Sequence, residues 1–347
     1  MKPNEIKKIL IIHTWGIGDL IMFTPALRAL REKLPQTQID ILITYQPVVA
    51  EVLEEGKTVN RIIKFFWKEK SFFEKLKLIL KLRKEKYDWT IVTGWTNPQK
   101  GGLLSFLFGA KYRVGAYKKN KSFFYTHQVP GVDSRPRRET NLDLVRLLGI
   151  KIKGMPESFF EFGEKNEEFA RDFIEKIGAK DKILIGFHPG AEPVHRYLLW
   201  PKEYFIDLGK KILQNYPETR LLVFAGPGEK DICQEIIREI KKEVFLVTDL
   251  SLKQVAALID NCRIFVASDS GLAQIAGATR TNLITIFGPS EARLFAPPGP
   301  NVKVFSEKCR HLYDENRIHT CLKKITPDMV FEETEKILAK NNHSFYN

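Results

Sequence analysis

Two glycine-bearing turns, each directly after a short apolar run, constrain the fold of this chain more than any other feature. The run Ile264–Val266 leads into Ser268-Asp269-Ser270-Gly271, and small residues typical of a helix follow at once. The next apolar run, Asn282–Phe287, ends in Gly288-Pro289-Ser290. A strand that leads into a helix N-terminus leaves backbone N–H groups and the helix dipole available to an anion. Two such turns on consecutive strands predict a nucleotide diphosphate pocket at the carboxyl edge of an α/β sheet.

Strand and helix patterns alternate along the whole sequence, which is typical of parallel βαβ units. We expect two Rossmann-like domains that face each other across a cleft, residues 1–155 and 156–347, joined by the linker Lys151–Gly163, which lacks a helical period. The last helix is assigned to the second domain, with packing back on the first domain as an alternative. The expected strands are 8–13, 39–44, 89–93, 112–116, 183–187, 220–224, 244–247, 264–266 and 282–287. The expected helices are 20–34, 48–55, 72–86, 140–148, 165–177, 202–215, 229–242, 252–261 and 327–340.

Composition excludes several classes of protein. Of the 347 residues, 44% are hydrophobic, enough for a core in each half, and no apolar run reaches the ~18 residues that a membrane span needs. The four cysteines, Cys233, Cys262, Cys309 and Cys321, form no Cys-x-x-Cys pair and no recognisable metal-ligand spacing. We therefore expect a cytoplasmic protein with reduced thiols, no metal and no cofactor. A Cys309–Cys321 disulfide is the less favoured alternative in a reducing compartment.

The net charge of +13 has two possible interpretations. A lysine-rich surface can reflect stability alone, or it can attract an anionic partner such as nucleic acid, a phosphorylated saccharide or an anionic membrane face. The excess lies in the first half, where residues 64–86 and 111–138 interleave basic with aromatic side chains. No zinc finger, basic zipper or RNA-recognition signature accompanies them, so nucleic acid is not the expected partner.

The first loop, His13-Thr14-Trp15-Gly16-Ile17-Gly18-Asp19, offers the clearest catalytic candidate. Gly16 and Gly18 allow a tight turn and the close approach of a ligand to the backbone. Asp19 then lies at or near a helix N-terminus, where aspartate is a good N-cap. The same carboxylate could instead act as a general base. The loop alone leaves both readings open.

A further observation is an ordered set of motifs along the chain. It comprises the first loop with Thr24-Pro25-Ala26-Leu27-Arg28-Ala29-Leu30 after it, His188-Pro189-Gly190-Ala191, Trp200-Pro201, Leu250-Ser251-Leu252, Ser268-Asp269-Ser270-Gly271 and Phe287-Gly288-Pro289-Ser290. With these motifs the chain resembles, over nearly its whole length, the heptosyltransferase family of bacterial glycosyltransferases (glycosyltransferase family 9). The resemblance implies a GT-B fold and inverting transfer of heptose from ADP-L-glycero-D-manno-heptose to a lipopolysaccharide core acceptor.

The resemblance also implies roles for individual residues. It makes Asp19 the general base that removes the proton of the acceptor hydroxyl. The donor-binding residues that we expect are Thr14, Gly16, Gly18, His188, Gly190, Arg196, Glu229, Leu250, Asp269, Ser270, Gly271 and Gln274. Within this set, Glu229 either accepts ribose hydroxyl hydrogen bonds or only stabilises its helix, and Leu250 lies against the base. His188 is the one histidine expected to contact a ligand, whereas His13 is expected to pack and His127 to lie at the surface.

Two positions depart from the family pattern. Leu198 and Leu199 stand before Trp200-Pro201 where a basic residue is usual, so Arg196 or His195 would have to supply the charge. Gln274 stands where histidine is common, and glutamine cannot become cationic. These departures motivate one alternative, a UDP- or GDP-sugar donor for surface polysaccharide. A non-catalytic nucleotide-sugar or nucleic-acid binder is the other. The expected partners are a nucleotide-sugar and an anionic glycolipid, with peripheral contact at the inner membrane face.

Overall fold

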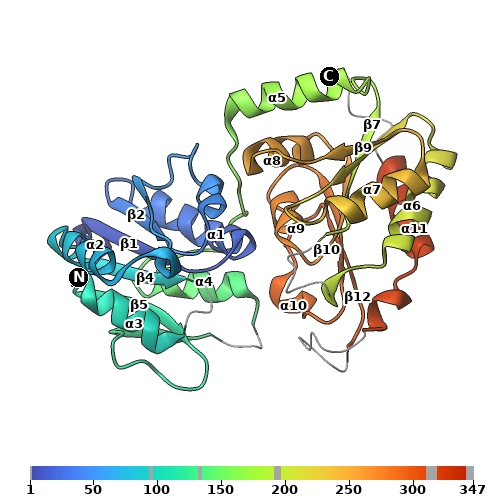
Figure 1. The fold of residues 1–347 in the computed structure, drawn as a ribbon. Helices are drawn as coiled ribbons and strands as arrows, with labels where there is room; N and C mark the ends of the chain where they lie inside the picture. The colour runs from blue at the N-terminus through green and yellow to red at the C-terminus, as the bar shows by residue number, and fades with distance from the viewer. Residues whose placement is uncertain (1, 94–96, 132–134, 191–196, 310–318, 341–347) are drawn as a thin grey trace. The chain divides into compact units, whose positions relative to one another are not determined.

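The chain forms two compact units. The computed structural model describes residues 2–93, 97–131, 135–190, 197–309 and 319–340 (Figure 1). Unit 1 comprises Met1–Glu161 and unit 2 comprises Phe162–Asn347. This division lies six residues after the expected boundary (161 − 155), at the end of a stretch, Lys151–Phe162, that contains neither helix nor strand.

Unit 1 is built on a six-stranded parallel sheet with the order β3-β2-β1-β4-β5-β6. The strands are β1 (Lys8–His13), β2 (Gln38–Ile43), β3 (Arg61–Lys64), β4 (Trp89–Thr93), β5 (Tyr112–Tyr117) and β6 (His127–Pro130). The apolar run Ile9–Ile12 of the central strand β1 is fully buried. Such a continuous apolar run is typical of a parallel strand that is covered on both faces.

Four helices cover this sheet: α1 (Ile17–Lys33), α2 (Phe72–Lys84), α3 (Pro98–Leu107) and α4 (Arg137–Arg146). Helices α1 and α4 pack against each other. Helices α2 and α3 contribute to a hydrophobic cluster with β1. In it, Leu78 and Leu82 of α2 are buried together with Leu10 and Ile12 of β1, and Leu104 of α3 packs against them. The expected helix at 48–55 is instead the 3₁₀ helix η2 (Pro47–Val52). Two shorter 3₁₀ turns, η1 (Pro3–Glu5) and η3 (Trp67–Glu69), complete the unit.

Unit 2 repeats the same topology. Its strands are β7 (Ile183–His188), β8 (Thr219–Phe224), β9 (Val244–Val247), β10 (Ile264–Ser268), β11 (Asn282–Phe287) and β12 (Val302–Ser306), in the order β12-β11-β10-β7-β8-β9 and all parallel. Counted from the first strand of each unit, both sheets follow the 3-2-1-4-5-6 order of the Rossmann fold. The prediction of two Rossmann-like domains with parallel sheets is confirmed.

The helices of unit 2 lie on both faces of its sheet (Figure 1). One group is α5 (Gly163–Lys176), α8 (Leu252–Asp260) and α9 (Gly271–Ala276), and the other is α6 (Lys202–Asn215), α7 (Lys230–Ile240) and α11 (Pro327–Ala339). The short helices α10 (Ala292–Phe295) and η5 (Cys321–Lys324) complete the described elements. The last helix, α11, packs on α6 of the same unit.

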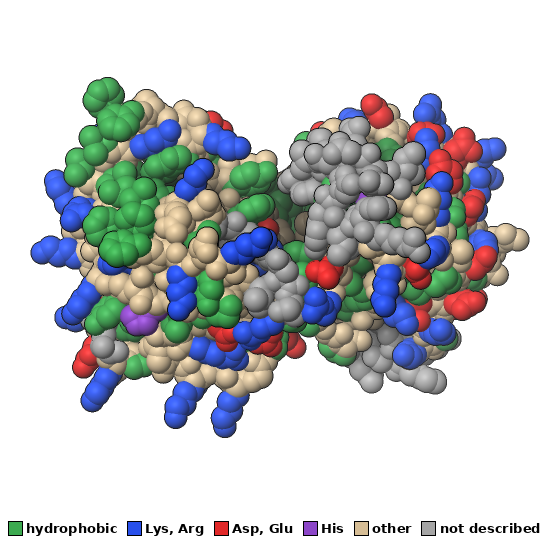
Figure 2. All heavy atoms as spheres, turned by 90° about the horizontal axis from the view of Figure 1, so that it is seen from below, with side chains coloured by type: hydrophobic (Ala, Val, Ile, Leu, Met, Phe, Trp, Pro, Cys, Tyr) green, Lys and Arg blue, Asp and Glu red, His purple; other side chains and the backbone are tan. Residues whose placement is uncertain are grey.

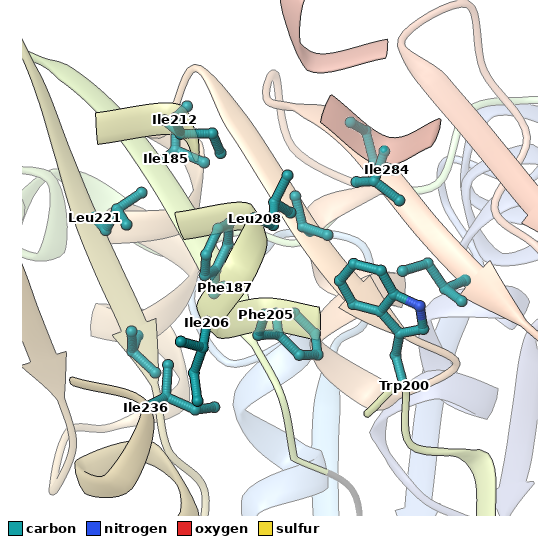
Figure 3. Packing of buried hydrophobic residues seen from close by; sticks show 14 of the residues in the cluster. Ile185, Phe187, Trp200, Phe205, Ile206, Leu208, Ile212, Leu221, Ile236 and Ile284 are labelled. Carbon is teal, nitrogen blue, oxygen red and sulfur yellow. The ribbon is translucent and has the colours of Figure 1, made fainter. Parts of the chain in front are cut away.

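The core between the sheet of unit 2 and α6 is mainly aliphatic and includes the aromatic side chains of Phe187, Trp200 and Phe205 (Figure 3). Trp200 and Phe205 meet edge to face with their ring centroids 4.9 Å apart. Trp200 also donates two hydrogen bonds, from its backbone N to Ser268 Oγ (2.9 Å) and from Nε1 to the carbonyl of Ile325 (2.8 Å). This residue therefore ties the end of β10 to the segment before α11.

The sequence analysis missed several strands at the edges of the sheets and the helices α3 and α10. Strands β3, β6 and β12 lie at or next to a sheet edge, and each is short, so their apolar patterns are weak. Helix α3 contains Gly101 and Gly102, which reduce its helix propensity. None of the described helices is both long and apolar enough to cross a membrane.

Candidate active site

The strand order of unit 2 reverses between β7 and β10, which are neighbours at the centre of the sheet. Chains that leave neighbouring strands in opposite directions at such a point open a crevice at the carboxyl edge, where α/β proteins bind ligands. Most of the predicted donor-binding residues lie at the carboxyl ends of β7, β8 and β10 or in the segments that follow these strands: His188, Gly190, Glu229, Asp269, Ser270, Gly271 and Gln274.

His188 joins three of these loops. It is the last residue of β7 and its side chain is buried. Its Nδ1 lies 3.1 Å from Ser270 Oγ, after β10, and its Nε2 lies 3.2 Å from Glu229 Oε2, after β8. The structure thus brings together three residues that are far apart in sequence and that were all predicted to bind the donor.

Glu229 is held from two sides. Its Oε2 accepts a 2.6 Å hydrogen bond from the backbone N–H of Gly226, in addition to the contact with His188. Burial alone would raise the pKa of Glu229, but the hydrogen bonds from His188 and Gly226 and the charge of His188 lower it overall. The carboxylate is therefore ionised at neutral pH. Glu229 occupies the N-cap position of α7, yet its side chain is turned to Gly226 and His188.

Gly190 is required by this arrangement. A Cβ atom at Gly190 would lie 2.1 Å from the carboxyl carbon of Glu229, far inside van der Waals contact. The His-Pro-Gly turn and Glu229 therefore pack directly on each other. Any side chain at this position would force the glutamate away from His188.

The turn after β10 begins helix α9. Ser270 is the N-cap, and its Oγ accepts a hydrogen bond from the N–H of Ala273 (3.3 Å), while Gly271 is the first helical residue. Asp269 is half-buried, and its backbone N–H continues the ladder by donating to the carbonyl of Ile286. The side chain of Gln274 is buried and donates from Nε2 to the carbonyl of Phe295 (2.8 Å).

The turn after β11 contributes a buried hydroxyl. Ser290 Oγ is buried without a hydrogen-bond partner among the residues that the structure describes. An unpaired buried hydroxyl is unfavourable, and a ligand oxygen at this turn would satisfy it.

The predicted donor-binding roles of Leu250 and Arg196 remain predictions. Leu250 is half-buried in the loop between β9 and α8. Asp249, the residue before it, forms an ion pair with Lys230 at the start of α7, with Nζ and Oδ2 3.4 Å apart. Arg196 and His195 lie outside the described residues, so their assignment stays a prediction.

Asp19 lies in the first turn of α1, in unit 1. The N-cap of this helix is Gly16, with extended backbone angles (φ −76°, ψ −174°), and Ile17, Gly18 and Asp19 are the first three helical residues. The interpretation of Asp19 as an N-cap is therefore wrong, because the helix begins earlier than the apolar pattern indicated. A carboxylate in the first turn is stabilised by the helix dipole. Thr14, Gly16 and Gly18, which were predicted to bind the donor, are also half-buried.

His13 anchors the loop that precedes Asp19. It ends β1 fully buried, with Nδ1 2.7 Å from Thr93 Oγ1 at the end of the neighbouring strand β4 and Nε2 3.3 Å from the carbonyl of Gly16. Burial lowers the pKa of His13 to about 4, against smaller opposing effects of the hydrogen bonds that the ring donates to the backbone of the loop. The neutral ring donates from Nε2 to Gly16 and accepts at Nδ1. Sequence analysis expected packing at His13 and missed this polar role.

A second grouping was also missed. The cysteines are not all scattered, because the ligand atoms of Cys309, His319 and Cys321 lie within 4.8 Å of one another. The His-x-Cys spacing of His319 and Cys321 was the available signal, but Cys309 is ten residues away and only the fold brings it near.

Comparison with known proteins identifies the family. The family model described as glycosyltransferase family 9 (heptosyltransferase) matches residues 75–325, more than half of the chain. Lipopolysaccharide heptosyltransferase 3 of Escherichia coli (strain K12) is 25% identical over 347 aligned positions, which cover 93% of this chain and 96% of that protein.

Solved structures have the same fold. The structure of E. coli ADP-heptose lipopolysaccharide heptosyltransferase II has a TM-score of 0.79 at 23% identity and covers 96% of this chain and 99% of its own. That of E. coli heptosyltransferase WaaC with ADP has a TM-score of 0.71 at 18% identity and covers 95% of this chain and 99% of its own. With its two Rossmann-like units and its matching family model, the chain belongs to glycosyltransferase family 9, the heptosyltransferases.

Proposed function

We propose that the protein transfers heptose from ADP-L-glycero-D-manno-heptose to a lipopolysaccharide core acceptor, with inversion at the anomeric carbon. The observation that carries the proposal is the His188–Glu229–Ser270 cluster at the β7/β10 switch point of a family 9 glycosyltransferase. The names of the E. coli relatives support the donor, since the name of one includes ADP-heptose and another was solved with ADP.

The donor would bind unit 2 through distinct chemical groups. The carboxylate of Glu229, fixed by Gly226 and His188, is suited to accept hydrogen bonds from ribose hydroxyls. Backbone N–H groups near Ser270 and Gly271, together with the buried hydroxyl of Ser290, are suited to the diphosphate. The diphosphate gains negative charge as the glycosidic bond breaks, so these donors would act most strongly in the transition state.

Asp19 would act on the acceptor. The attacking hydroxyl loses a proton as it bonds to the anomeric carbon, and a carboxylate can receive that proton. His13 supports this role indirectly, because its hydrogen bonds to Thr93 and Gly16 hold the loop before Asp19.

The substitution Asp19→Asn tests the role of the carboxylate. Asparagine keeps the shape but cannot take a proton, so we expect turnover to fall by roughly 10²–10⁴-fold, the usual contribution of a general base. Steady-state kinetics with ADP-heptose measure this, and NMR of the product determines whether the configuration is inverted.

A matched variant separates base from donor binding. Glu229→Gln keeps the size of the side chain but removes the charge that pairs with His188, so it should weaken ADP affinity in calorimetry, whereas Asp19→Asn should leave it unchanged. Wild-type turnover in Asp19→Asn would remove Asp19 from the mechanism.

The acceptor side of the proposal includes a membrane-facing surface on unit 1. Phe72, Phe73, Leu76 and Leu80 on α2 are exposed, as are Leu103 and Phe106 on α3 and Phe123 in the β5–β6 loop. Figure 2 shows hydrophobic side chains gathered on one face of unit 1 among Lys and Arg side chains. Apolar rings with surrounding cations suit an anionic glycolipid at the cytoplasmic face of the inner membrane.

A further inference from the structure

Two cysteines and a histidine converge in the segment between β12 and α11. Cys309 follows β12 by three residues, and Cys321 begins η5, the short helix before α11. The Sγ of Cys309 lies 3.1 Å from Nδ1 of His319, and all three ligand atoms lie within 4.8 Å of one another. None of these side chains belongs to the donor-binding or catalytic residues described above.

This ligand set has a definite chemical preference. Two thiolates and one imidazole suit a borderline-soft ion such as Zn²⁺, which binds sulfur at about 2.3 Å and nitrogen at about 2.0–2.1 Å in tetrahedral geometry. Those bond lengths place neighbouring ligand atoms about 3.5–3.8 Å apart. Adjustments of a fraction of an ångström to about one ångström would bring the three atoms to these separations. We propose that Cys309, His319 and Cys321 bind one zinc ion, with a fourth position left for a water or another ligand.

The three ligand residues are packed against neighbouring parts of unit 2. Cys321 is buried, while Cys309 and His319 are half-buried. The Tyr197 ring lies 5.7 Å from the His319 ring, centroid to centroid. A Cβ atom at Gly288 would lie 2.6 Å from Leu322 and 3.1 Å from Cys321 Sγ, so the Gly-Pro-Ser turn after β11 rests directly on this cluster.

Binding would therefore stabilise more than the cluster itself. Coordination releases both thiol protons to solvent and links chain positions twelve residues apart (321 − 309). The ion would hold Cys321 and Leu322 beneath Gly288, and hence support the turn that carries Ser290. This role does not depend on the identity of the sugar donor.

Metal analysis of the full-length protein tests the proposal. Protein prepared under reducing conditions with zinc in the growth medium should contain one zinc ion per chain by mass spectrometry of the elements. Cys309→Ser and His319→Ala should each lose most of it. Cys262→Ser is the matched control, because Cys262 is a buried cysteine outside the cluster whose Sγ donates a hydrogen bond to the carbonyl of Leu258.

Cobalt gives a readout that is independent of folding yield. Adding Co²⁺ to the metal-free wild type should produce thiolate-to-cobalt charge-transfer absorption and the visible bands of a tetrahedral site, and both should be absent in Cys309→Ser. A chelator should lower the Tm of the wild type but not that of the Cys309→Ser variant. The proposal is overturned if the wild type binds neither ion, if both variants keep full metal content, or if Cys309 and Cys321 form a disulfide under reducing conditions.

Discussion

At the scale of single residues, His13 shows how burial sets a protonation state. Its ring is fully buried between Thr93 and Gly16, and burial lowers its pKa to about 4, from an ordinary value of about 6.5. The folded protein therefore holds the neutral ring, while the unfolded chain takes up a proton below pH 6.5. The stability associated with His13 is fully present above about pH 6.5 and is lost as the pH falls towards 4.

This shift predicts a pH-dependent difference between the wild type and His13→Gln. Between pH 7 and pH 4 the advantage of the wild type in the free energy of unfolding should shrink by about 3 kcal/mol, because glutamine does not titrate. Urea unfolding at several pH values measures both proteins. Parallel curves for the two proteins would show that His13 accepts a proton in the folded state without penalty.

At the scale of secondary structure, helix α1 contains a proline that its sequence accommodates locally. Pro25 has no N–H to donate to the carbonyl of Ile21, four residues earlier. The hydroxyl of Thr24 donates to that carbonyl instead (2.7 Å) and accepts a hydrogen bond from the backbone N–H of Phe159 (3.1 Å). The Thr-Pro pair thus keeps α1 continuous and attaches the chain near the end of unit 1 to it.

Replacement of Thr24 by valine should destabilise the protein strongly, although it hardly changes the size of the side chain. Thr24→Val keeps the shape of the side chain but leaves the carbonyl of Ile21 and the N–H of Phe159 without this partner, and each unpaired buried group costs about 1–3 kcal/mol. Chemical denaturation of the purified variant measures the loss. Thr24→Ser, which keeps the hydroxyl, is the control, and a loss in Thr24→Val no greater than in Thr24→Ser would contradict the role of the hydrogen bonds.

At the scale of the whole molecule, charge and exposed apolar surface act together. The chain carries a net charge of +13, and unit 1 exposes Phe72 and Phe73 at 72% and 78% of their surface. Burial of an aromatic side chain in a bilayer interface is favourable by about 1.5–3 kcal/mol, and cations near an anionic surface add about 1 kcal/mol each. We therefore expect reversible binding to anionic membranes, and binding that weakens as salt screens the charges.

Sedimentation with lipid vesicles tests this surface in the full-length protein. Binding should be strong with phosphatidylglycerol vesicles and weak with phosphatidylcholine vesicles. The double substitution Phe72→Ser, Phe73→Ser should reduce it by roughly tenfold or more. Met329→Ser is the control, since Met329 is an exposed apolar residue of α11 in unit 2. Equal binding by both variants would mean that α2 does not enter the bilayer.

Much of the fold followed from local pattern. Strands β1, β4, β9 and β11 and helix α6 have the predicted bounds, and most other predicted elements differ by only a few residues. Their signal is strong because buried parallel strands require continuous apolar runs and their helices require a 3.6-residue period. The elements missed lack that signal, since an edge strand such as β6 is half-exposed and ends in proline.

The candidate site likewise has features that follow from local sequence and features that depend on the fold. The residue types that follow each strand could be predicted locally, because glycine turns and helix N-caps are requirements of strand–helix connections. The contacts of His188 with Glu229 and Ser270, of His13 with Thr93, and of Cys309 with His319 and Cys321 arise from the fold. Strand order and the packing of distant segments set these contacts, and neither is encoded in the spacing of residues along the chain.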